Sequence, residues 1–127
     1  MKLKIVSPIL GFESVKEVHF SPIDDFFSRI ENEPISFTLI RPERLRQYAF
    51  EIPLFYKDLL QAQSDEDLEV YTIITVYKPI EKSTVNFAAP VLINPKKGLL
   101  AQVMLDDTKY PEYGIREPIE NYLGKED

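Results

Sequence analysis

The side chains that could perform acid–base or nucleophilic chemistry are few in this chain. It has one histidine, His19, and no cysteine, which excludes thiolate nucleophiles, disulfides and cysteine-ligated metal centres. His19 alternates with apolar residues within Val15–Phe20, so we predict that it faces solvent from a strand. A small hydrolase or ligand-binding enzyme that uses His19 with a carboxylate is the alternative function. The sequence contains neither a Gly-x-Ser-x-Gly elbow nor a glycine-rich phosphate loop.

Three groups of adjacent acids could hold a metal ion or act in acid–base chemistry: Asp24-Asp25, Asp65-Glu66-Asp67 and Asp106-Asp107. Neighbouring residues of a strand point to opposite faces, and no calcium-binding loop supplies further ligands. We therefore predict turn formers or a helix start, with no metal site and no cofactor. Asp106 and Asp107 stand apart because they precede a loop that carries Tyr110 and Tyr113, a composition suited to recognition of a protein partner.

Arginines cluster only at Arg41, Arg44 and Arg46. A nucleic-acid module would use them as phosphate contacts. The chain has 21 acids against 15 bases, a net charge of -6, which disfavours a polyanionic partner. We expect a solvated loop here and no direct nucleic-acid binding. Phe87 lies between an asparagine and two alanines, where it could equally plug a barrel or line a groove beside a strand edge.

These residues need a scaffold, and the pattern predicts an all-β one. The 127 residues fit a single domain, 1–123, with a flexible tail at 124–127. Ten prolines divide the chain into short runs of branched and aromatic residues. Leu68–Tyr77 is apolar on both faces and is expected to be a central strand. We expect 99–105 to be a half-buried antiparallel strand that follows a hairpin loop at 94–98. The fold class is therefore mainly β, a small antiparallel β-barrel-like domain.

One or two short helices complete the expected fold. Pro53–Ala62 places Phe55, Leu59 and Ala62 on one helical face, and Ser21–Ile30 offers Ser21 as an N-cap before a proline. The N-terminus does not read as a signal peptide, and no apolar run is long enough to span a membrane. We expect a cytoplasmic protein, a monomer without membrane association.

The order of these segments resembles the FliW family of bacterial flagellar assembly factors. Gly11-Phe12-Glu13 is similar to the end of its N-terminal Gly-Leu-Pro-Gly-Phe-Glu signature, although the first glycine is missing. The run 86–94 resembles its Asn-Leu-x-Ala-Pro-Ile-Val-Ile-Asn strand, with Phe87 in place of the usual leucine. The run 102–111, followed by Arg116, is similar to its Gln-x-Val-Leu-Asp-Asp-x-x-Tyr ending.

The resemblance implies a β-barrel-like protein without enzymatic activity. It implies binding of cytoplasmic flagellin near the C-terminal region of that chain, as a chaperone, and antagonism of the translational repressor CsrA, which couples flagellin translation to secretion. The apolar stripe of a flagellin end could be covered by a groove or captured as a strand at a sheet edge. The motif positions imply partner contacts at Asn86, Phe87, Asp106, Asp107 and Tyr110.

Overall fold

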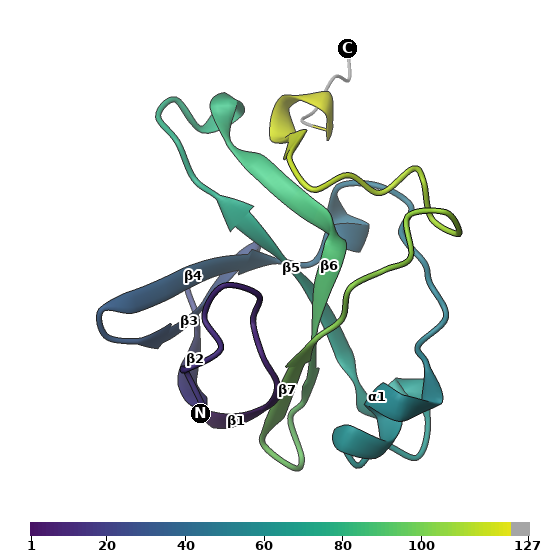
Figure 1. The fold of residues 1–127 in the computed structure, drawn as a ribbon. Coiled ribbons are helices and arrows are strands. Elements are labelled where there is room, and N and C mark those ends of the chain that lie inside the picture. Colours follow the sequence, from purple (N-terminus) through teal and green to yellow (C-terminus); the bar gives the residue numbers. More distant parts are fainter. Residues whose placement is uncertain (123–127) are drawn as a thin grey trace.

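A computed structural model describes residues 1–122 as a closed barrel of seven strands (Figure 1). In chain order the strands are β1 (Lys2–Ser7), β2 (Glu17–Pro22), β3 (Phe27–Asn32), β4 (Ile35–Ile40), β5 (Glu69–Thr75), β6 (Thr84–Asn94) and β7 (Leu99–Gln102). Around the ring the order is β5-β4-β3-β2-β1-β7-β6, and β6 pairs back onto β5. All pairs are antiparallel except β1–β7. The expected fold class is confirmed.

Short elements decorate the ring. The only α-helix of residues 1–122 is α1 (Leu54–Leu59), and β8 (Glu117–Pro118) pairs with the start of β6. Residues 1–122 also contain four 3-10 turns: η1 (Pro42–Arg44), η2 (Asp65–Asp67), η3 (Ile80–Lys82) and η4 (Ile119–Tyr122). None of the helices in this part of the chain is long and apolar enough to cross a membrane. The predicted tail, 124–127, lies outside the described residues.

All seven strands send side chains into the barrel. The interior cluster consists of Leu3, Ile5, Ile9, Val18, Ile30, Leu39, Tyr71, Val91, Ile93 and Leu100. β5 is covered on both faces as its pattern predicts, because Tyr71 joins this cluster while Leu68 and Ile74 pack outside the ring. Val76 and Tyr77 were expected to continue the strand, but they lie beyond it and are exposed. The apolar alternation thus located a central strand and overestimated its length.

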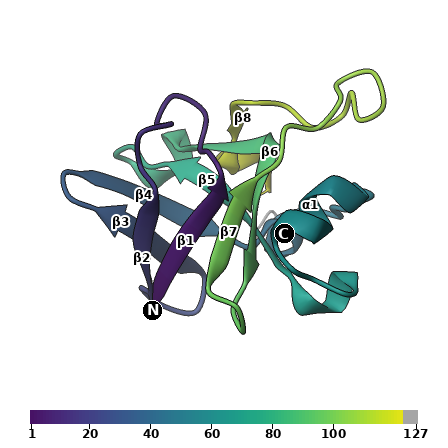
Figure 2. The ribbon, with the colours of Figure 1, turned by 60° about the horizontal axis from the view of Figure 1, so that its bottom comes forward.

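Residues 50–62 cover the outside of the barrel next to β6 and β7 (Figure 2). Ile52 and Leu60 are buried there against Leu92 and Ala101. Asn94, also buried, donates from Nδ2 to the Leu60 carbonyl at 2.8 Å and so ties the end of α1 to the β6–β7 hairpin. That hairpin turns at 94–98 as expected. Gly98 supplies its positive φ of 67° and donates its N–H to the Asn94 carbonyl.

Residues 99–105 and α1 both depart from the predicted exposure. β7 is a strand antiparallel to β6, but it ends at Gln102 and all four of its residues are buried. It is not half-buried, because β1 flanks its other edge and residues 50–62 cover its outer face. α1 is short as predicted, yet Phe55 is 64% exposed and the packed face is formed by Tyr56, Leu60 and Ala62.

The helix predicted over Ser21–Ile30 is wrong. This segment is a β-hairpin, in which Ser21 pairs with Arg29 across β2 and β3. Asp24, for which a turn or a helix start was left open, forms a turn: its carboxylate accepts from the N–H groups of Phe26 and Phe27, each at 2.8 Å. The side chain that suggested a helix start therefore stabilises a tight turn, a role for which aspartate is equally suited.

The turn at Gly11 forms although the first glycine of the N-terminal signature is missing. The Phe12 N–H donates to the Ile9 carbonyl at 2.8 Å, and Gly11 is the third residue of that turn, with a φ of 88°. A turn of this kind needs positive φ only at its third position. The Leu10 N–H donates to Oε1 of Gln102, and that buried side chain also donates to the Ala89 carbonyl. The β1–β2 loop is thus fixed to β7 and β6 without the extra glycine.

Candidate functional site

The structure gives His19 no catalytic partner within residues 1–122. His19 is an exposed residue of β2, as predicted, and Glu31 is its neighbour across the β2–β3 pair. Within residues 1–122 no hydrogen bond joins the two side chains, and the one hydrogen-bond contact of Nε2 is with the N-terminal amine at 3.4 Å. The same part of the chain contains no group of three side chains able to hold a metal ion.

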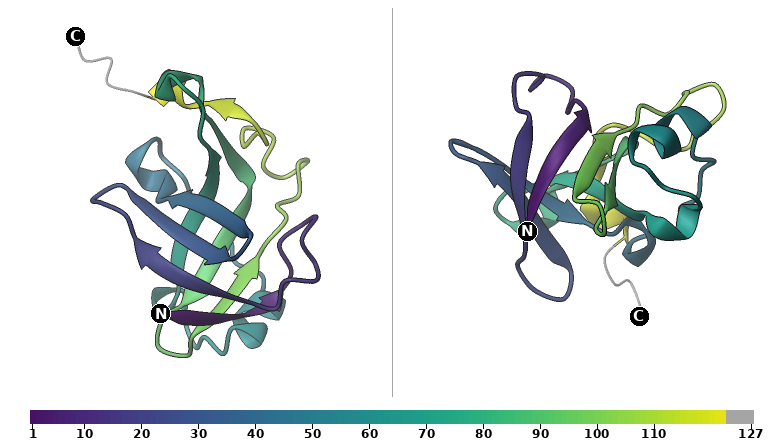
Figure 3. Two further views of the ribbon diagram at one scale, coloured as in Figure 1. Left: turned by 90° about the vertical axis from the view of Figure 1, so that its left-hand side faces the viewer. Right: turned by 90° about the horizontal axis from the view of Figure 1, so that it is seen from below.

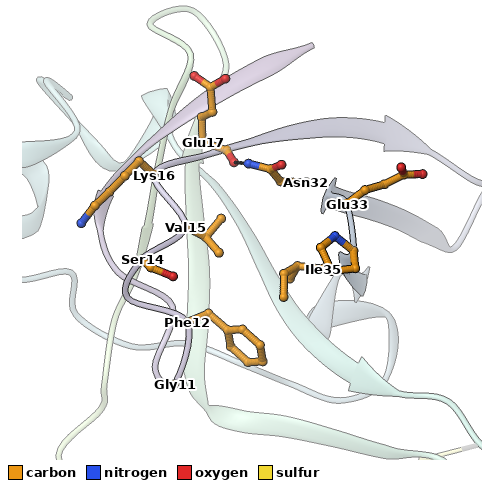
Figure 4. A pocket seen from close by; sticks show the side chains of 10 residues that line it. Gly11, Phe12, Ser14, Val15, Lys16, Glu17, Asn32, Glu33 and Ile35 are labelled. Carbon is orange, nitrogen blue, oxygen red and sulfur yellow. Dashed lines mark hydrogen bonds between the residues drawn. The ribbon is translucent and has the colours of Figure 1, made fainter.

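A broad hollow of about 560 Å³ lies between the β1–β2 loop and the β3–β4 turn (Figure 4). Phe12, Val15 and Ile35 line it together with charged residues. The Asn32 side chain donates to the Glu17 carbonyl at 3.0 Å, and the Lys16 side chain donates to the Glu13 carbonyl. These polar side chains of the hollow therefore form hydrogen bonds with nearby backbone groups. Acid, base and nucleophile are not brought together here.

Of the three clustered arginines, which were expected to lie in a solvated loop, Arg46 differs most from that expectation. Its side chain is 22% exposed and forms an ion pair with Glu117 at 3.3 Å. The guanidinium lies 4.9 Å from the ring centre of Tyr113 and 5.3 Å from that of Phe87. Its partners lie about 40 to 75 residues further along the chain, so no local pattern announces the contact. Arg46 thus joins the loop after η1 to the C-terminal segment.

The other two arginines are also held by neighbours. Arg41 donates to the Tyr71 hydroxyl at 3.1 Å and pairs with Glu69 at 3.5 Å. Burial, together with the hydrogen bond from its hydroxyl to Glu69, raises the pKa of Tyr71 to about 12. Arg44 stacks over the exposed ring of Phe26 at 4.9 Å and forms no salt bridge within residues 1–122. Arg44 is therefore the one arginine of the three that agrees with the expected solvated loop.

The loop at 106–113 is a strap that fastens residues 49–51. Asp106 accepts from the hydroxyl and the N–H of Thr108, contacts that lower the pKa of its carboxyl, and its carbonyl accepts from the Tyr110 N–H. The Tyr110 hydroxyl accepts from the Glu51 N–H at 2.9 Å. The Tyr113 hydroxyl accepts from the Ala49 N–H at 2.9 Å and donates to the Ala49 carbonyl at 3.0 Å. Two tyrosines therefore complete the backbone hydrogen bonding of a segment that has no strand partner.

The five predicted contact residues differ in how far they are buried. Phe87 is fully buried, and its backbone N–H donates to the Gly114 carbonyl while its carbonyl accepts from the Tyr48 hydroxyl. Neither of the two roles left open for it is found within residues 1–122: the ring lies outside the barrel interior and lines no groove, because it is enclosed in the cluster that contains Val85 and Tyr113. Asn86 is half-buried and accepts from the Ala88 N–H. Asp106 and Asp107 are exposed, and Tyr110 is half-buried. No observation here tests their contact with a partner, which stays a prediction.

An apolar groove of about 390 Å³, called here the end groove, lies where the β2–β3 turn, η1, η3 and η4 meet. It is lined by Phe26, Phe27, Ile40, Arg44, Leu45, Ile80, Ile119 and Tyr122. Phe26 is 54% and Ile80 is 45% exposed. The Ile119 N–H donates to the Ser83 carbonyl at 2.8 Å, which holds η4 beside η3, at the top of Figure 1. Apolar side chains gathered in a concave surface favour an apolar ligand.

Residues important for this arrangement were missed by sequence reasoning. Three side chains hold loops onto the barrel: Arg46, Gln102 and Asn94. The sequence around each of them predicts only a strand, a hairpin or a loop and does not identify these contacts. A polar side chain inside an apolar strand, such as Gln102, is the only available signal, since burying it requires hydrogen-bond partners.

Both the sequence and the fold are similar to those of known proteins. The family model "FliW protein" matches residues 1–119. The chain is 41% identical to "Flagellar assembly factor FliW 2" of Wolinella succinogenes, covering 99% of this chain and 95% of that one. It is 40% identical to "Flagellar assembly factor FliW 1" of Helicobacter pylori strain HPAG1, covering 99% and 97%.

The fold is also that of a solved relative. A "Crystal structure of the flagellar assembly factor FliW" superimposes with a TM-score of 0.83 at 25% identity, covering 93% of this chain and 84% of the other. The matches extend over nearly all of the chain and agree between sequence and structure. The protein therefore belongs to the FliW family of flagellar assembly factors.

Proposed function

We propose that this flagellar assembly factor acts as a chaperone that binds the C-terminal region of cytoplasmic flagellin. We also propose that it antagonises the translational repressor CsrA. The observation that carries the proposal is the family match over residues 1–119. Flagellin bound to the protein occupies it while subunits accumulate. Secretion of flagellin then frees the protein to bind the repressor, which restores flagellin translation. The protein acts in the cytoplasm, as a monomer, without catalysis and without touching RNA itself.

The end groove supports the flagellin part of the proposal. An unassembled flagellin end presents an apolar stripe, and Phe26 and Ile80 offer it an exposed apolar counterpart. A closed ring of seven strands leaves little free strand edge, which favours docking in the groove over strand capture. Arg44 lies at the groove with no salt-bridge partner in residues 1–122, so an acidic residue beside the stripe would pair with it. The half-buried Asn86 and the exposed Asp106 and Asp107 are proposed as further contacts with a protein partner, without assigning them to flagellin.

The test is a pull-down of purified flagellin on the immobilised protein. Full-length flagellin should be retained, and flagellin without its C-terminal segment should not. A variant with Phe26→Ser and Ile80→Ser should lose at least about tenfold in affinity, because two apolar anchors of the groove are removed. Its control is Leu54→Ser with Phe55→Ser, an apolar and more exposed pair elsewhere on the surface. Absence of any association with full-length flagellin would overturn the flagellin part of the function.

A further inference from the structure

Leu54 and Phe55 form an apolar helix face that nothing in residues 1–122 covers. They are adjacent, 71% and 64% exposed, and stand at the start of α1. Exposed apolar residues are common on protein surfaces, so the pair alone does not define a site, and its surroundings decide whether it is one. Phe55 packs edge-on against Tyr56 at 5.2 Å, and Tyr56 in turn contacts the core beneath α1.

This face is held rigidly enough to act as a docking surface. Asn94 fixes the end of α1 through the Leu60 carbonyl, and Lys57 pairs with Asp65 at 2.9 Å, which joins α1 to η2. The Tyr110 hydroxyl and the Lys109–Glu51 ion pair, at 3.1 Å, fasten the chain before α1. A surface ordered before binding loses less conformational entropy when a partner arrives.

The charge around the pair identifies the partner's chemistry. We define the acidic lobe as residues 49–67 and 106–112, which lie together on one side of the barrel, away from the β3–β4 hairpin (Figure 3). The lobe contains eight acids and two lysines, a net charge of -6, equal to that of the whole chain, so the remaining residues are neutral in sum. Both lysines are already paired, with Asp65 and Glu51. The other six carboxylates have no salt bridge within residues 1–122: Asp58, Glu66, Asp67, Asp106, Asp107 and Glu112.

We infer that the acidic lobe is the docking surface for a basic protein, whose apolar recess receives Leu54 and Phe55 while its cations face the unpaired carboxylates. An apolar centre within a charged rim is the usual anatomy of a protein interface. A cationic partner would be steered to this side of the molecule, since the lobe carries a net charge equal to that of the whole chain. The inference rests on the proposed function. In that function the basic partner is the repressor CsrA, and flagellin binds in the end groove.

The experiment measures binding of purified CsrA and of flagellin to three forms of the full chain. These are the wild type, the lobe variant Leu54→Ser with Phe55→Ser, and the groove variant Phe26→Ser with Ile80→Ser. The lobe variant should weaken CsrA binding at least about tenfold and leave flagellin binding within twofold. The groove variant, a matched pair of exposed apolar residues, should show the reverse. Circular dichroism checks that both variants fold.

A second variant tests the charge. Asp58→Asn with Glu66→Gln keeps the shape of the lobe and should flatten the dependence of CsrA affinity on salt concentration. Equal CsrA affinity and equal salt dependence in the wild type and both lobe variants would overturn the inference and leave the proposed function standing. Failure of the wild type to bind CsrA at all would overturn both, and the two results are distinct.

Discussion

Arg46 connects segments that are far apart in the sequence, and it does so in a partly enclosed setting. Its ion pair with Glu117 and its contact with the Tyr113 ring hold the C-terminal turns against the loop after η1. The Tyr122 hydroxyl and the Gly114 N–H also donate to Glu117, so one carboxylate serves three partners. Removing the arginine would leave that carboxylate without its cation in a site with little water.

We therefore expect Arg46→Ala to lower the free energy of unfolding by about 2 kcal/mol, from the lost ion pair and cation–π contacts. Urea denaturation followed by fluorescence measures the change. The control is Arg44→Ala, which removes only a contact with the exposed ring of Phe26 and should cost less than about 1 kcal/mol. Equal losses in the two variants would contradict the structural role given to Arg46.

Tyr71 makes stability depend on pH at the alkaline end. Its pKa is about 12 in the folded protein, against 10.0 for an ordinary tyrosine. The unfolded chain releases the phenolic proton near pH 10 while the folded chain retains it, so folding loses free energy as pH rises from 10 to 12. We expect this fall to be about 2 kcal/mol smaller in Tyr71→Phe, measured by urea denaturation across that interval. The same slope in both proteins would contradict the assignment.

At the scale of elements, the strap at 106–113 replaces a strand partner for residues 49–51. We expect Tyr113→Phe to cost about 1 kcal/mol of stability, because both backbone groups of Ala49 lose their partner. Hydrogen exchange of the Ala49 amide should accelerate at least about tenfold. Tyr77→Phe is the control, since Tyr77 is half-exposed and its hydroxyl has no hydrogen bond within residues 1–122. Unchanged exchange at Ala49 in Tyr113→Phe would show that the strap does not hold this segment.

Sequence reasoning succeeded where an element is defined by its own residues. The two apolar faces of 68–77 predicted a central strand, found over Glu69–Thr75, and the Asn-Pro-Lys-Lys-Gly run predicted the β6–β7 hairpin. It failed over Ser21–Ile30, where serine, proline and two aspartates suit a helix start and a β-turn equally. Pairing with β1 and β4 decides between them, and that information lies outside the segment.

The same limit applies to the candidate site. Motif residues such as Asp106 and Tyr110 were identified, but their task of strapping residues 49–51 depends on a contact between segments about 60 residues apart. The end groove was not predicted, because its lining comes from the β2–β3 turn, η1, η3 and η4, and no single run carries it. The acidic lobe was visible only as an overall negative charge, since its two parts meet through tertiary contacts.

At the scale of the whole molecule, the end groove and the acidic lobe are joined by one continuous stretch of chain. Leu45 lines the groove, Arg46 pairs with Glu117, and Ala49 and Glu51 are fastened by the strap. Leu54 begins the exposed face of the lobe. A ligand that displaces Leu45 therefore acts on the same segment that positions α1. Coupling between two sites requires a contiguous element of this kind that both ligands bias.

The proposed exchange of partners then has a measurable consequence. Flagellin in the end groove should weaken CsrA binding at the lobe by about 5- to 150-fold, which corresponds to a coupling free energy of about 1 to 3 kcal/mol, and CsrA should weaken flagellin binding by the same factor. Titration of CsrA with and without saturating flagellin measures the coupling. Tyr113→Phe should reduce it, because this variant loosens residues 49–51 and leaves the side chains of both surfaces unchanged. Independent binding of the two proteins to the wild type, or undiminished coupling in Tyr113→Phe, would show that the segment between the surfaces does not transmit the exchange.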